Sequence, residues 1–440
     1  MEKLKIYPVD KKNLKGRLEI AVPGSKSYAN RALLTAALAE GKSVLTNMLI
    51  SDDTAVMIQA LKDLGIKIKQ DGTTLQIHGG GGKFKKPKGK LYFENAGTAI
   101  RFMAAALAMQ DFESIITGNP RMKNRPIKDL VDALRSGGAE IEYLGTEGYP
   151  PLLLKGGFKG GKIKVPGTIS SQFVSSLLLI SPYTKELTEI VIEGVLTSKP
   201  YVDMTLKVMK DFGVSKGKRA GYQRFIIDNK THYKGTKYEI EADASSASYF
   251  FALGALHGIE VTVTNSKYHS AQGDIKLVNL LEKSGCHVNK DAKIGISVKG
   301  PEKLDNLKSI GDIDMNTMPD VALTMAIVAA FSKGRTRLKN IPNLRVKESD
   351  RILAMTQELM KVNCKARQMA EGIEVKGHPH KYHGAEIETY DDHRIAMCFG
   401  VFGTVIPGIT ILNPGCVSKT YPNFWKDLKK IGVETEIIKS

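Results

Sequence analysis

Val22-Pro23-Gly24-Ser25-Lys26-Ser27-Tyr28-Ala29-Asn30-Arg31 is a stretch whose construction recurs along this chain. Pro23-Gly24 ends the preceding strand, and an apolar helix is predicted from about Asn30 to Ala39. Lys26, Ser27 and Arg31 therefore lie at or near a helix N-terminus, where free N–H groups and the helix dipole favour an anion. A Lys ammonium, a Ser hydroxyl and an Arg fork add charge and bidentate geometry. The stretch predicts an anion-binding helix start.

Amphipathic helices followed by a turn residue and a short strand recur at a regular interval. A glycine or asparagine past the helix end supplies the left-handed residue that joins a helix to a strand. The turn residues are Gly65, Gly138, Gly213, Gly285, Asn363 and Gly432, with steps of 69 to 78 residues. The segments are Val56–Ile68, Leu130–Ile141, Met204–Val214, Ile275–Val288, Ile352–Ala366 and Phe424–Ile437. Six copies at this spacing predict an internal repeat.

Each copy also contains a second helix that is apolar nearly all round. These helices are Ala32–Ala39, Ala99–Met109, Phe173–Ile180, Tyr249–His257, Val321–Phe331 and Ile395–Val405. A helix without a polar face must be buried, yet polar residues precede every one of them. Capping explains the Ser, Asn and Asp residues at these places. It does not explain Lys26, Gln172, His393 or Arg394, because a buried polar or charged group requires a partner.

The six copies predict an α/β fold of two domains with three repeats each. We place the boundary before Glu241-Ala242-Asp243, so that 23–241 forms one domain and 1–22 with 242–440 forms the other. If the six buried helices point their N-termini at one interdomain cleft, that cleft carries a positive potential. The expected ligand is a polyanion.

Composition narrows the classes of partner. The chain has 440 residues with 64 Lys and Arg against 46 Asp and Glu, a net charge of +18. The basic residues are spread along the chain, which favours small polyanions over nucleic acid or an anionic membrane. The N-terminus lacks a signal-peptide pattern, and Ile395–Leu412 is predicted to be a buried helix and a strand rather than a membrane span. The four cysteines lack CxxC spacing, so we expect a cytoplasmic protein.

Five segments resemble the signature segments of the 5-enolpyruvylshikimate-3-phosphate synthase (EPSP synthase) family, and the resemblance runs from about residue 17 to the C-terminus. The segments are Pro23-Gly24-Ser25-Lys26-Ser27-x-x-Asn30-Arg31-Ala32, Asn95-Ala96-Gly97-Thr98-Ala99-x-Arg101, Arg345-Val346-Lys347-Glu348-Ser349-Asp350-Arg351, Asp392-His393-Arg394 with Ala396-Met397, and Ser418-Lys419-Thr420. The resemblance implies two inverse α/β barrels, each built of three βαβαββ units. It also implies a transferase of the shikimate pathway, which leads to chorismate and the aromatic amino acids. The reaction joins phosphoenolpyruvate to the 5-hydroxyl of shikimate 3-phosphate and releases phosphate.

The resemblance assigns both substrates to named residues. For shikimate 3-phosphate they are Lys26, Ser27, Arg31, Ser170, Ser171, Gln172, Ser198, Tyr201, Asp320, Asn343 and Lys347. For phosphoenolpyruvate they are Lys26, Asn95, Gly97, Arg125, Gln172, Glu348, Arg351, Arg394 and Lys419. Together the substrates carry about five negative charges, which these Lys and Arg side chains can meet. Neither a cofactor nor a metal site is expected, and the implied partners are the two small molecules, with no nucleic acid and no membrane. We expect a monomer.

Two carboxylates among these cations are candidates for proton transfer. As an isolated feature, Asp320 is a helix-start acid and Glu348 a solvated charge. The chemistry, however, needs one group to deprotonate the attacking hydroxyl and another to protonate the methylene carbon of phosphoenolpyruvate. The family assignment makes Asp320 the base and Glu348 the acid, with Lys26 a further candidate, and which of the three carries each proton stays open. Asp52-Asp53 is either a helix cap or a partner for nearby basic residues, and a structural role is favoured.

The chain departs from the family pattern at two positions. Phe102 stands where many members have Pro, and Asn124 where Glu is common. Phe102 is expected to affect the packing under Gly97. In the family, a small residue at the position of Gly97 leaves room for glyphosate. This chain has glycine there, so it is predicted to be a glyphosate target.

Two other functions compete with this assignment. The sister family, UDP-N-acetylglucosamine enolpyruvyl transferase, has Lys-Asn where this chain has Lys26-Ser27. It also usually carries a Cys in the loop that here reads Gly118–Pro126 and contains none. A nucleic-acid-binding protein is suggested by net charge alone, without a basic stripe interleaved with aromatic residues.

Overall fold

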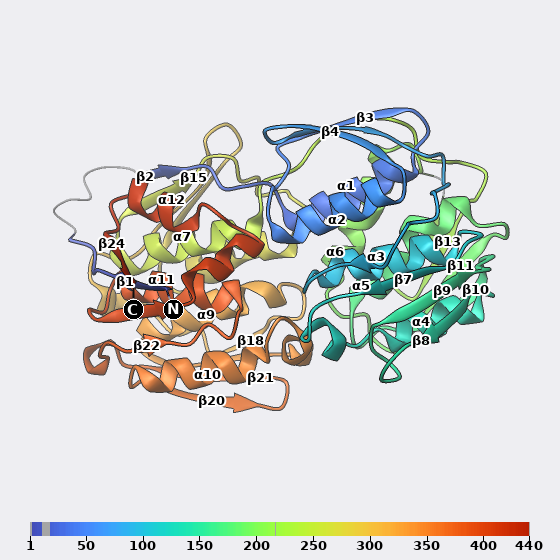
Figure 1. Cartoon of the computed structure of the whole chain (residues 1–440). Coiled ribbons are helices and arrows are strands. Elements are labelled where there is room, and N and C mark those ends of the chain that lie inside the picture. Colours follow the sequence, from blue (N-terminus) through green and yellow to red (C-terminus); the bar gives the residue numbers. More distant parts are fainter. Residues whose placement is uncertain (1, 11–17, 216, 440) are drawn as a thin grey trace. The chain divides into compact units, whose positions relative to one another are not determined.

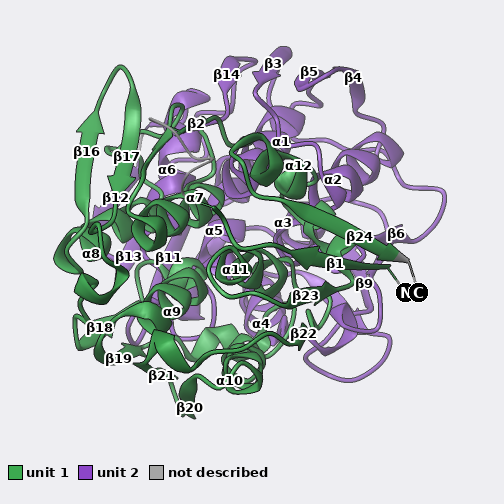
Figure 2. Cartoon of the chain, turned by 90° about the vertical axis from the view of Figure 1, so that its left-hand side faces the viewer, with its two compact units in different colours: residues 1–23, 242–440 green, residues 24–241 purple. Residues whose placement is uncertain are grey.

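The computed structural model describes residues 2–10, 18–215 and 217–439 (Figure 1). The chain divides into two compact units. Unit 1 comprises Met1–Pro23 and Ala242–Ser440, and unit 2 comprises Gly24–Glu241 (Figure 2). Each unit contains three four-stranded sheets of one topology among its described residues. In every sheet one edge strand pairs in parallel with its neighbour, and the other two strand pairings are antiparallel.

Unit 2 contains three repeats with two helices each. The first sheet has the order β14 (Lys237–Glu239), β3 (Lys42–Thr46), β5 (Thr74–His78), β4 (Lys67–Asp71), with helices α1 (Lys26–Leu38) and α2 (Asp52–Asp63). The second has the order β6 (Leu91–Tyr92), β7 (Ser114–Thr117), β9 (Leu152–Gly156), β8 (Glu140–Tyr143), with α3 (Gly97–Ala108) and α4 (Lys128–Ser136). The third has the order β10 (Gly161–Pro166), β11 (Thr188–Glu193), β13 (Arg224–Ile227), β12 (Gly217–Ala220), with α5 (Ser171–Ile180) and α6 (Pro200–Asp211).

Unit 1 follows the same plan. Its first sheet has the order β2 (Leu18–Ile20), β15 (Glu260–Val263), β17 (Gly295–Lys299), β16 (His287–Asp291), with α7 (Ala244–His257) and α8 (Leu277–Lys283). The second has the order β18 (Asp312–Asp314), β19 (Gly334–Lys339), β21 (Gly372–Gly377), β20 (Lys365–Met369), with α9 (Ala322–Phe331) and α10 (Arg351–Lys361). The third has the order β22 (Glu386–Ile387), β23 (Ile409–Leu412), β1 (Glu2–Ile6), β24 (Thr435–Lys439), with α11 (His393–Gly403) and α12 (Phe424–Lys430).

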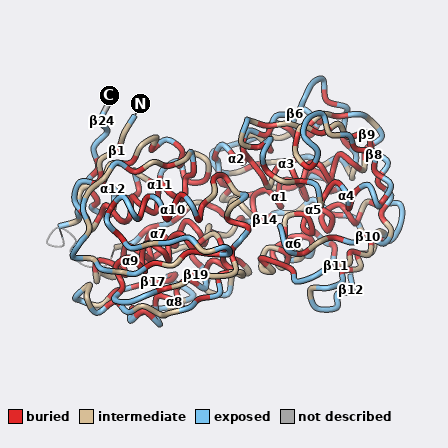
Figure 3. Tube along the Cα trace, turned by 90° about the horizontal axis from the view of Figure 1, so that it is seen from below, coloured by how far each residue is buried: buried red, intermediate tan, exposed pale blue. Residues whose placement is uncertain are grey.

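The odd-numbered helices are the apolar ones that the sequence predicts to be buried. Every residue of α7, α9 and α11 is buried, and the same three helices run through the red parts of the tube in Figure 3. Side chains of these helices join one core cluster of unit 1.

Ile395–Leu412 forms α11 and β23, as predicted, and among the described residues no helix is long and apolar enough to cross a membrane. Burial raises the pKa of Cys286 to about 12 and of Cys364 to about 11.

The predicted start of the first helix is wrong by one turn. Helix α1 begins at Lys26 and not near Asn30, because Ser25 caps it: the Ser25 side chain accepts a hydrogen bond from the Tyr28 N–H at 3.5 Å. Lys26 and Ser27 are therefore the first two residues of the helix. Their backbone N–H groups are among those that lack an intrahelical acceptor.

Candidate active site

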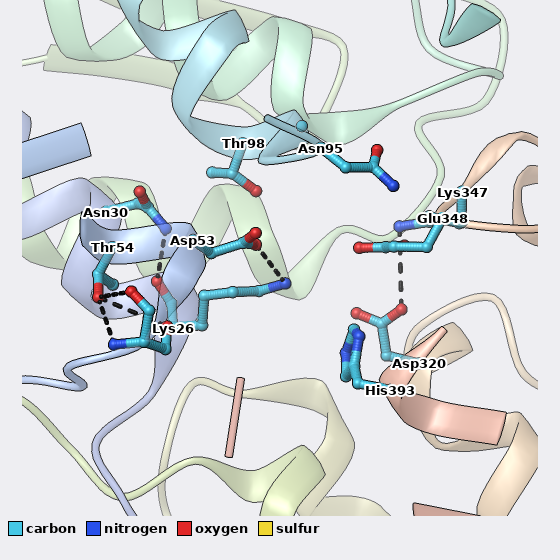
Figure 4. A network of polar contacts seen from close by, with 12 residues as sticks. Lys26, Asn30, Asp53, Thr54, Asn95, Thr98, Asp320, Lys347, Glu348 and His393 are labelled. Carbon is cyan, nitrogen blue, oxygen red and sulfur yellow. Dashed lines mark hydrogen bonds and ion pairs between the residues drawn. The ribbon is translucent and has the colours of Figure 1, made fainter. Parts of the chain in front are cut away.

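The N-terminal turn of α1 presents the first of the predicted cations in unit 2. Lys26 Nζ lies 3.1 Å from Asp53 Oδ2, and both side chains are largely buried (Figure 4). Asp53 belongs to the first turn of α2. The structural role expected for this acid is therefore a specific one: it fixes the ammonium group of Lys26.

Arg31 is buried among neutral acceptors of three helices. Its Nε donates to Thr205 Oγ1 at 2.8 Å, its Nη1 to the Ser27 carbonyl at 2.9 Å, and its Nη2 to Ser175 Oγ and the Tyr201 carbonyl. No carboxylate of the described residues pairs with it. Burial lowers the pKa of Arg31 to about 10. The guanidinium therefore joins α1, α5 and α6.

Phe102 contacts the guanidinium of Arg31. The Arg31 guanidinium carbon lies 5.3 Å from the centroid of the Phe102 ring and 5.9 Å from that of Tyr201. Phe102 is completely buried. An aromatic ring at this position stabilises a buried cation through its π face, which a proline could not do.

Gly97 lies against two arginines at the start of α3. A Cβ atom added at Gly97 would stand 2.4 Å from Arg125 Nη2 and 2.8 Å from Arg101 Nη1. Arg125, which follows the turn η1 (Met122–Asn124), donates from Nη1 to both oxygens of Asn95 at 2.9 Å. Its Nε is buried with no hydrogen-bond partner among the described residues. The missing side chain of Gly97 therefore lets the Arg125 guanidinium approach the helix start.

Gln172 connects α5 to α3. Its Oε1 accepts a hydrogen bond from Arg101 Nη1 at 2.8 Å, and its Nε2 donates to Thr98 Oγ1 at 3.1 Å. Arg101 also donates to the Pro126 carbonyl at 2.7 Å. These contacts fix the amide orientation of Gln172 and tie Arg101 to the segment that carries Arg125. Arg101 and Thr98 are members of the quoted motif to which the sequence assigned no role.

Four further predicted residues lie at the starts of helices. Ser170 is the N-cap of α5 and accepts a hydrogen bond from the Gln172 N–H, and Ser171 is the first residue of that helix. Ser198 precedes α6 with a φ of 54°, and Tyr201 is the second residue of α6. Helix-start N–H groups and hydroxyls are suited to hold an oxyanion.

In unit 1 the predicted residues gather around one guanidinium. Arg351 opens α10 and is only 2% exposed. Its Nη1 lies 3.0 Å from Asp320 Oδ1, its Nη2 2.9 Å from Glu348 Oε2, and its Nε 2.8 Å from Asp392 Oδ2. Burial by itself lowers the pKa of Arg351, but Asp392 and Glu348 outweigh it and raise the pKa above the ordinary value. Three carboxylates are thus held by one buried cation.

Asp320 is surrounded by cations. In addition to Arg351, Lys347 Nζ lies 3.8 Å from Oδ1 (Figure 4). Arg394 Nη2 lies 3.3 Å from Oδ2. Asp320 belongs to the turn η5 (Pro319–Val321), immediately before the buried helix α9. These contacts stabilise a negative charge on Asp320.

Asp392 is a site residue that the sequence analysis did not assign. It is the N-cap of α11 and is fully buried. Besides Arg351, it accepts hydrogen bonds from Ser349 Oγ and the Arg394 N–H, each at 3.0 Å. The signal was available in the motif Asp392-His393-Arg394, because Asp is a preferred helix cap. His393 is also buried, with Nδ1 3.8 Å from Asp392 Oδ1.

The remaining predicted residues lie in the turns of unit 1. Asn343 is buried within η6 (Pro342–Val346), and Lys347 is the residue that ends this turn. Lys419 is the last residue of η8 (Pro414–Lys419). Among the described residues, no group of three His, Cys, Asp or Glu side chains could hold a metal ion.

Comparison with known proteins shows which family this chain resembles. The family model for EPSP synthase (3-phosphoshikimate 1-carboxyvinyltransferase) matches residues 9–428. A 3-phosphoshikimate 1-carboxyvinyltransferase of Klebsiella pneumoniae (strain 342) is 46% identical over 437 residues, covering 98% of this chain and 99% of that protein. One from Xenorhabdus nematophila is 45% identical over 439 residues, covering 99% of this chain and 100% of that protein. A solved EPSP synthase structure from Acinetobacter baumannii covers both chains completely with 27% identity and a TM-score of 0.80.

Proposed function

The chain belongs to the EPSP synthase family, and on that premise we propose that its two clusters of predicted residues act on one pair of substrates. The family's reaction transfers the carboxyvinyl group of phosphoenolpyruvate to the 5-hydroxyl of shikimate 3-phosphate and releases phosphate. This is a step in aromatic amino acid biosynthesis. The fold is the family's two-domain inverse α/β architecture.

The single observation that carries the site assignment is the Arg351 cluster. One guanidinium contacts both Asp320 and Glu348, the two carboxylates that the chemistry calls for as base and acid. Proton-transfer groups are useful only when they are held in fixed positions near the reacting atoms. Arg351, anchored by Asp392, supplies that fixed position for both.

The proposed first step adds the 5-hydroxyl oxygen to C2 of phosphoenolpyruvate. Asp320 accepts the hydroxyl proton, and Glu348 delivers a proton to the methylene carbon C3. The contact with Arg351 favours the charged form of Glu348, so the bound substrate anions must offset that cation before Glu348 can act as an acid. In the second step the bond from C2 to the phosphate oxygen breaks, C3 returns a proton to the Glu348 carboxylate, which restores the double bond, and the proton held by Asp320 leaves with the phosphate. Lys26 is the further candidate for one of these transfers.

We assign the substrate anions by the chemistry of the cations. Arg394 suits the carboxylate of phosphoenolpyruvate because an Arg fork matches a carboxylate. Arg351 belongs to the same set through Asp320 and Glu348, because its N–H groups already contact three carboxylates. Lys26, Arg125 and Lys419 suit its phosphate, and Asn95, Gly97, Gln172 and Glu348 complete the set proposed for phosphoenolpyruvate. The set proposed for shikimate 3-phosphate comprises Lys26, Ser27, Arg31, Ser170, Ser171, Gln172, Ser198, Tyr201, Asp320, Asn343 and Lys347. Arg31 reaches this substrate through its neighbours, since four of its N–H groups already have acceptors within unit 2.

Residues of both units contribute to these sets, so we propose that a domain of 23–241 and a domain of 1–22 with 242–440 both supply substrate-binding residues. We also propose a cytoplasmic monomer that needs no cofactor. The high positive charge of the chain supports small polyanionic substrates.

Release of phosphate tests the proposed assignment. The purified chain is incubated with phosphoenolpyruvate and either shikimate 3-phosphate or UDP-N-acetylglucosamine. We expect phosphate only with shikimate 3-phosphate, and a severe loss of turnover in Glu348→Gln and Lys26→Met with the fold retained. Turnover with UDP-N-acetylglucosamine would show that the chain has the activity of the sister family. Full turnover in both variants would overturn the roles assigned to Glu348 and Lys26.

A further inference from the structure

A carboxylate without an assigned role lies behind Arg394 in unit 1. Asp274, in the turn η3 (Gly273–Lys276), is buried. Ser245 Oγ donates a hydrogen bond to Asp274 Oδ2. Arg394 Nη2 in turn donates to the same Ser245 Oγ at 3.4 Å. Arg394, Ser245 and Asp274 therefore form a chain of hydrogen bonds.

The direction of these hydrogen bonds makes Ser245 depend on Asp274. A serine hydroxyl has one proton, and when Asp274 accepts it, the lone pairs of Ser245 face Arg394. A charged Asp274 polarises that hydroxyl and strengthens it as an acceptor. Arg394 Nη2 is thus held between Asp320 Oδ2 at 3.3 Å and Ser245 Oγ. The second contact would weaken if Asp274 lost its charge.

The surroundings of Asp274 make its charge sensitive to pH. Its Oδ1 is buried with no hydrogen-bond partner among the described residues. Burial, followed by the charge of Asp320, raises the pKa of Asp274 to about 7, while Arg394 and the Ser245 hydrogen bond oppose the rise. The cap residue Asp243 of α7 adds to it. Helix α8, also packed on η3, carries its acidic and basic side chains only at its exposed C-terminal end.

We propose that Asp274 is a positioning residue: through Ser245 it holds the Arg394 guanidinium in the orientation that receives the carboxylate of phosphoenolpyruvate. The inference rests on the proposed role of Arg394 in binding that substrate. Charged Asp274 orients Arg394, and protonated Asp274 donates to Ser245 and turns the serine proton elsewhere. The affinity for phosphoenolpyruvate therefore increases as pH rises through the range in which Asp274 loses its proton.

Steady-state kinetics of Asp274→Asn between pH 5.5 and pH 8.5 test the proposal. At pH 8 we expect KM for phosphoenolpyruvate to rise at least fivefold over wild type, whereas KM for shikimate 3-phosphate and kcat change less than twofold. At pH 5.5 the two proteins should have similar KM values, because wild-type Asp274 is then protonated. Comparison of the two proteins at each pH cancels the titration of the substrate itself. Glu302→Gln, an exposed acid of the same unit, is the charge-matched control and should follow wild type throughout.

Substitutions of Ser245 change the protein less and test the same inference if Asp274→Asn folds poorly. Ser245→Ala should raise KM for phosphoenolpyruvate and flatten its excess pH dependence, and Ser245→Thr should restore both. The double variant should be no worse than Ser245→Ala, since Asp274 acts through the hydroxyl. An Asp274→Asn effect that is equal at both pH values, or equal for both substrates, would overturn the inference. Absence of any turnover in wild type would instead reject the proposed function.

Discussion

Arg351 contacts Asp392 at two points, with Nε 2.8 Å from Oδ2 and Nη2 3.3 Å from Oδ1. The remaining nitrogen of this guanidinium, Nη1, lies 3.0 Å from Asp320 Oδ1. Asp392 is itself fixed as the cap of α11. The position of the proposed base therefore depends on a residue that need not touch the substrates.

Substitution Asp392→Asn should destabilise the protein strongly. It removes a charge from a buried pair and leaves Arg351 with less compensation, which costs on the order of 3–5 kcal/mol in the free energy of unfolding. Asp391→Asn is the matched control, since Asp391 has a φ of 53° that Asn tolerates, and its Oδ1 acceptor is retained. Urea unfolding measures both. Equal unfolding midpoints for the two variants would show that the Arg351 pair does not anchor the cluster.

Substitution Asp53→Asn should impair catalysis with little effect on the fold. Without the carboxylate 3.1 Å from its Nζ, Lys26 loses its orientation. A hydrogen bond to a charged group contributes about 1.5–3 kcal/mol, so kcat/KM should fall about 10- to 100-fold. The neighbouring and exposed Asp52 gives the control Asp52→Asn. If the two variants show the same kcat/KM, the pair with Lys26 has no catalytic consequence.

Gly97→Ala should weaken inhibition by glyphosate, which we expect to compete with phosphoenolpyruvate. The added methyl would stand 2.4 Å from Arg125 Nη2, and that guanidinium is held by Asn95. Steric overpacking of this kind costs about 1–3 kcal/mol. The substrate should also lose affinity through Arg125, but less than the inhibitor does. Inhibition constants of glyphosate measured for wild type and Gly97→Ala test this prediction. Equal values would show that Gly97 does not line the site.

Asp274 should make the protein less stable as pH rises toward 7. Its pKa is raised from 3.8 to about 7 by burial, so between these values the folded chain holds a proton that the unfolded chain has released. Stability falls with pH wherever the folded state binds more protons. Asp274→Asn lacks this term, so its melting temperature relative to wild type should increase from pH 4.5 to pH 8. A constant difference across that range would contradict the buried, titrating carboxylate.

The repeat and the buried helices could be predicted from the sequence because both are local patterns. Gly65 and its counterparts mark helix ends, and an unbroken apolar face such as that of α9 leaves only burial as an explanation. The sheet order was not predictable in the same way. β14 pairs with β3 across most of unit 2, and β1 inserts between β23 and β24 from the other end of the chain. No local pattern specifies such distant pairings.

The same limit applies to the site. The motif Arg345–Arg351 contains Glu348 and Arg351, and the resemblance assigns Asp320, but neither indicates that one guanidinium contacts both acids. Asp274 has no sequence signal, because its importance comes from Ser245 and Arg394, which the fold brings beside it. The helix start at Lys26 was not predicted. Pro23-Gly24 indicates a break in regular structure, whereas Ser25, which follows this pair directly, already caps the helix.

Carboxyvinyl transfer without a metal can be followed by phosphorus NMR of the purified chain mixed with equal amounts of phosphoenolpyruvate and shikimate 3-phosphate in excess EDTA. We expect the phosphoenolpyruvate signal to disappear and inorganic phosphate to appear in equal amount. The phosphate ester on the shikimate ring should persist in the product. Persistence of phosphoenolpyruvate, or loss of the ring phosphate instead, would contradict carboxyvinyl transfer by the Lys and Arg residues assigned here.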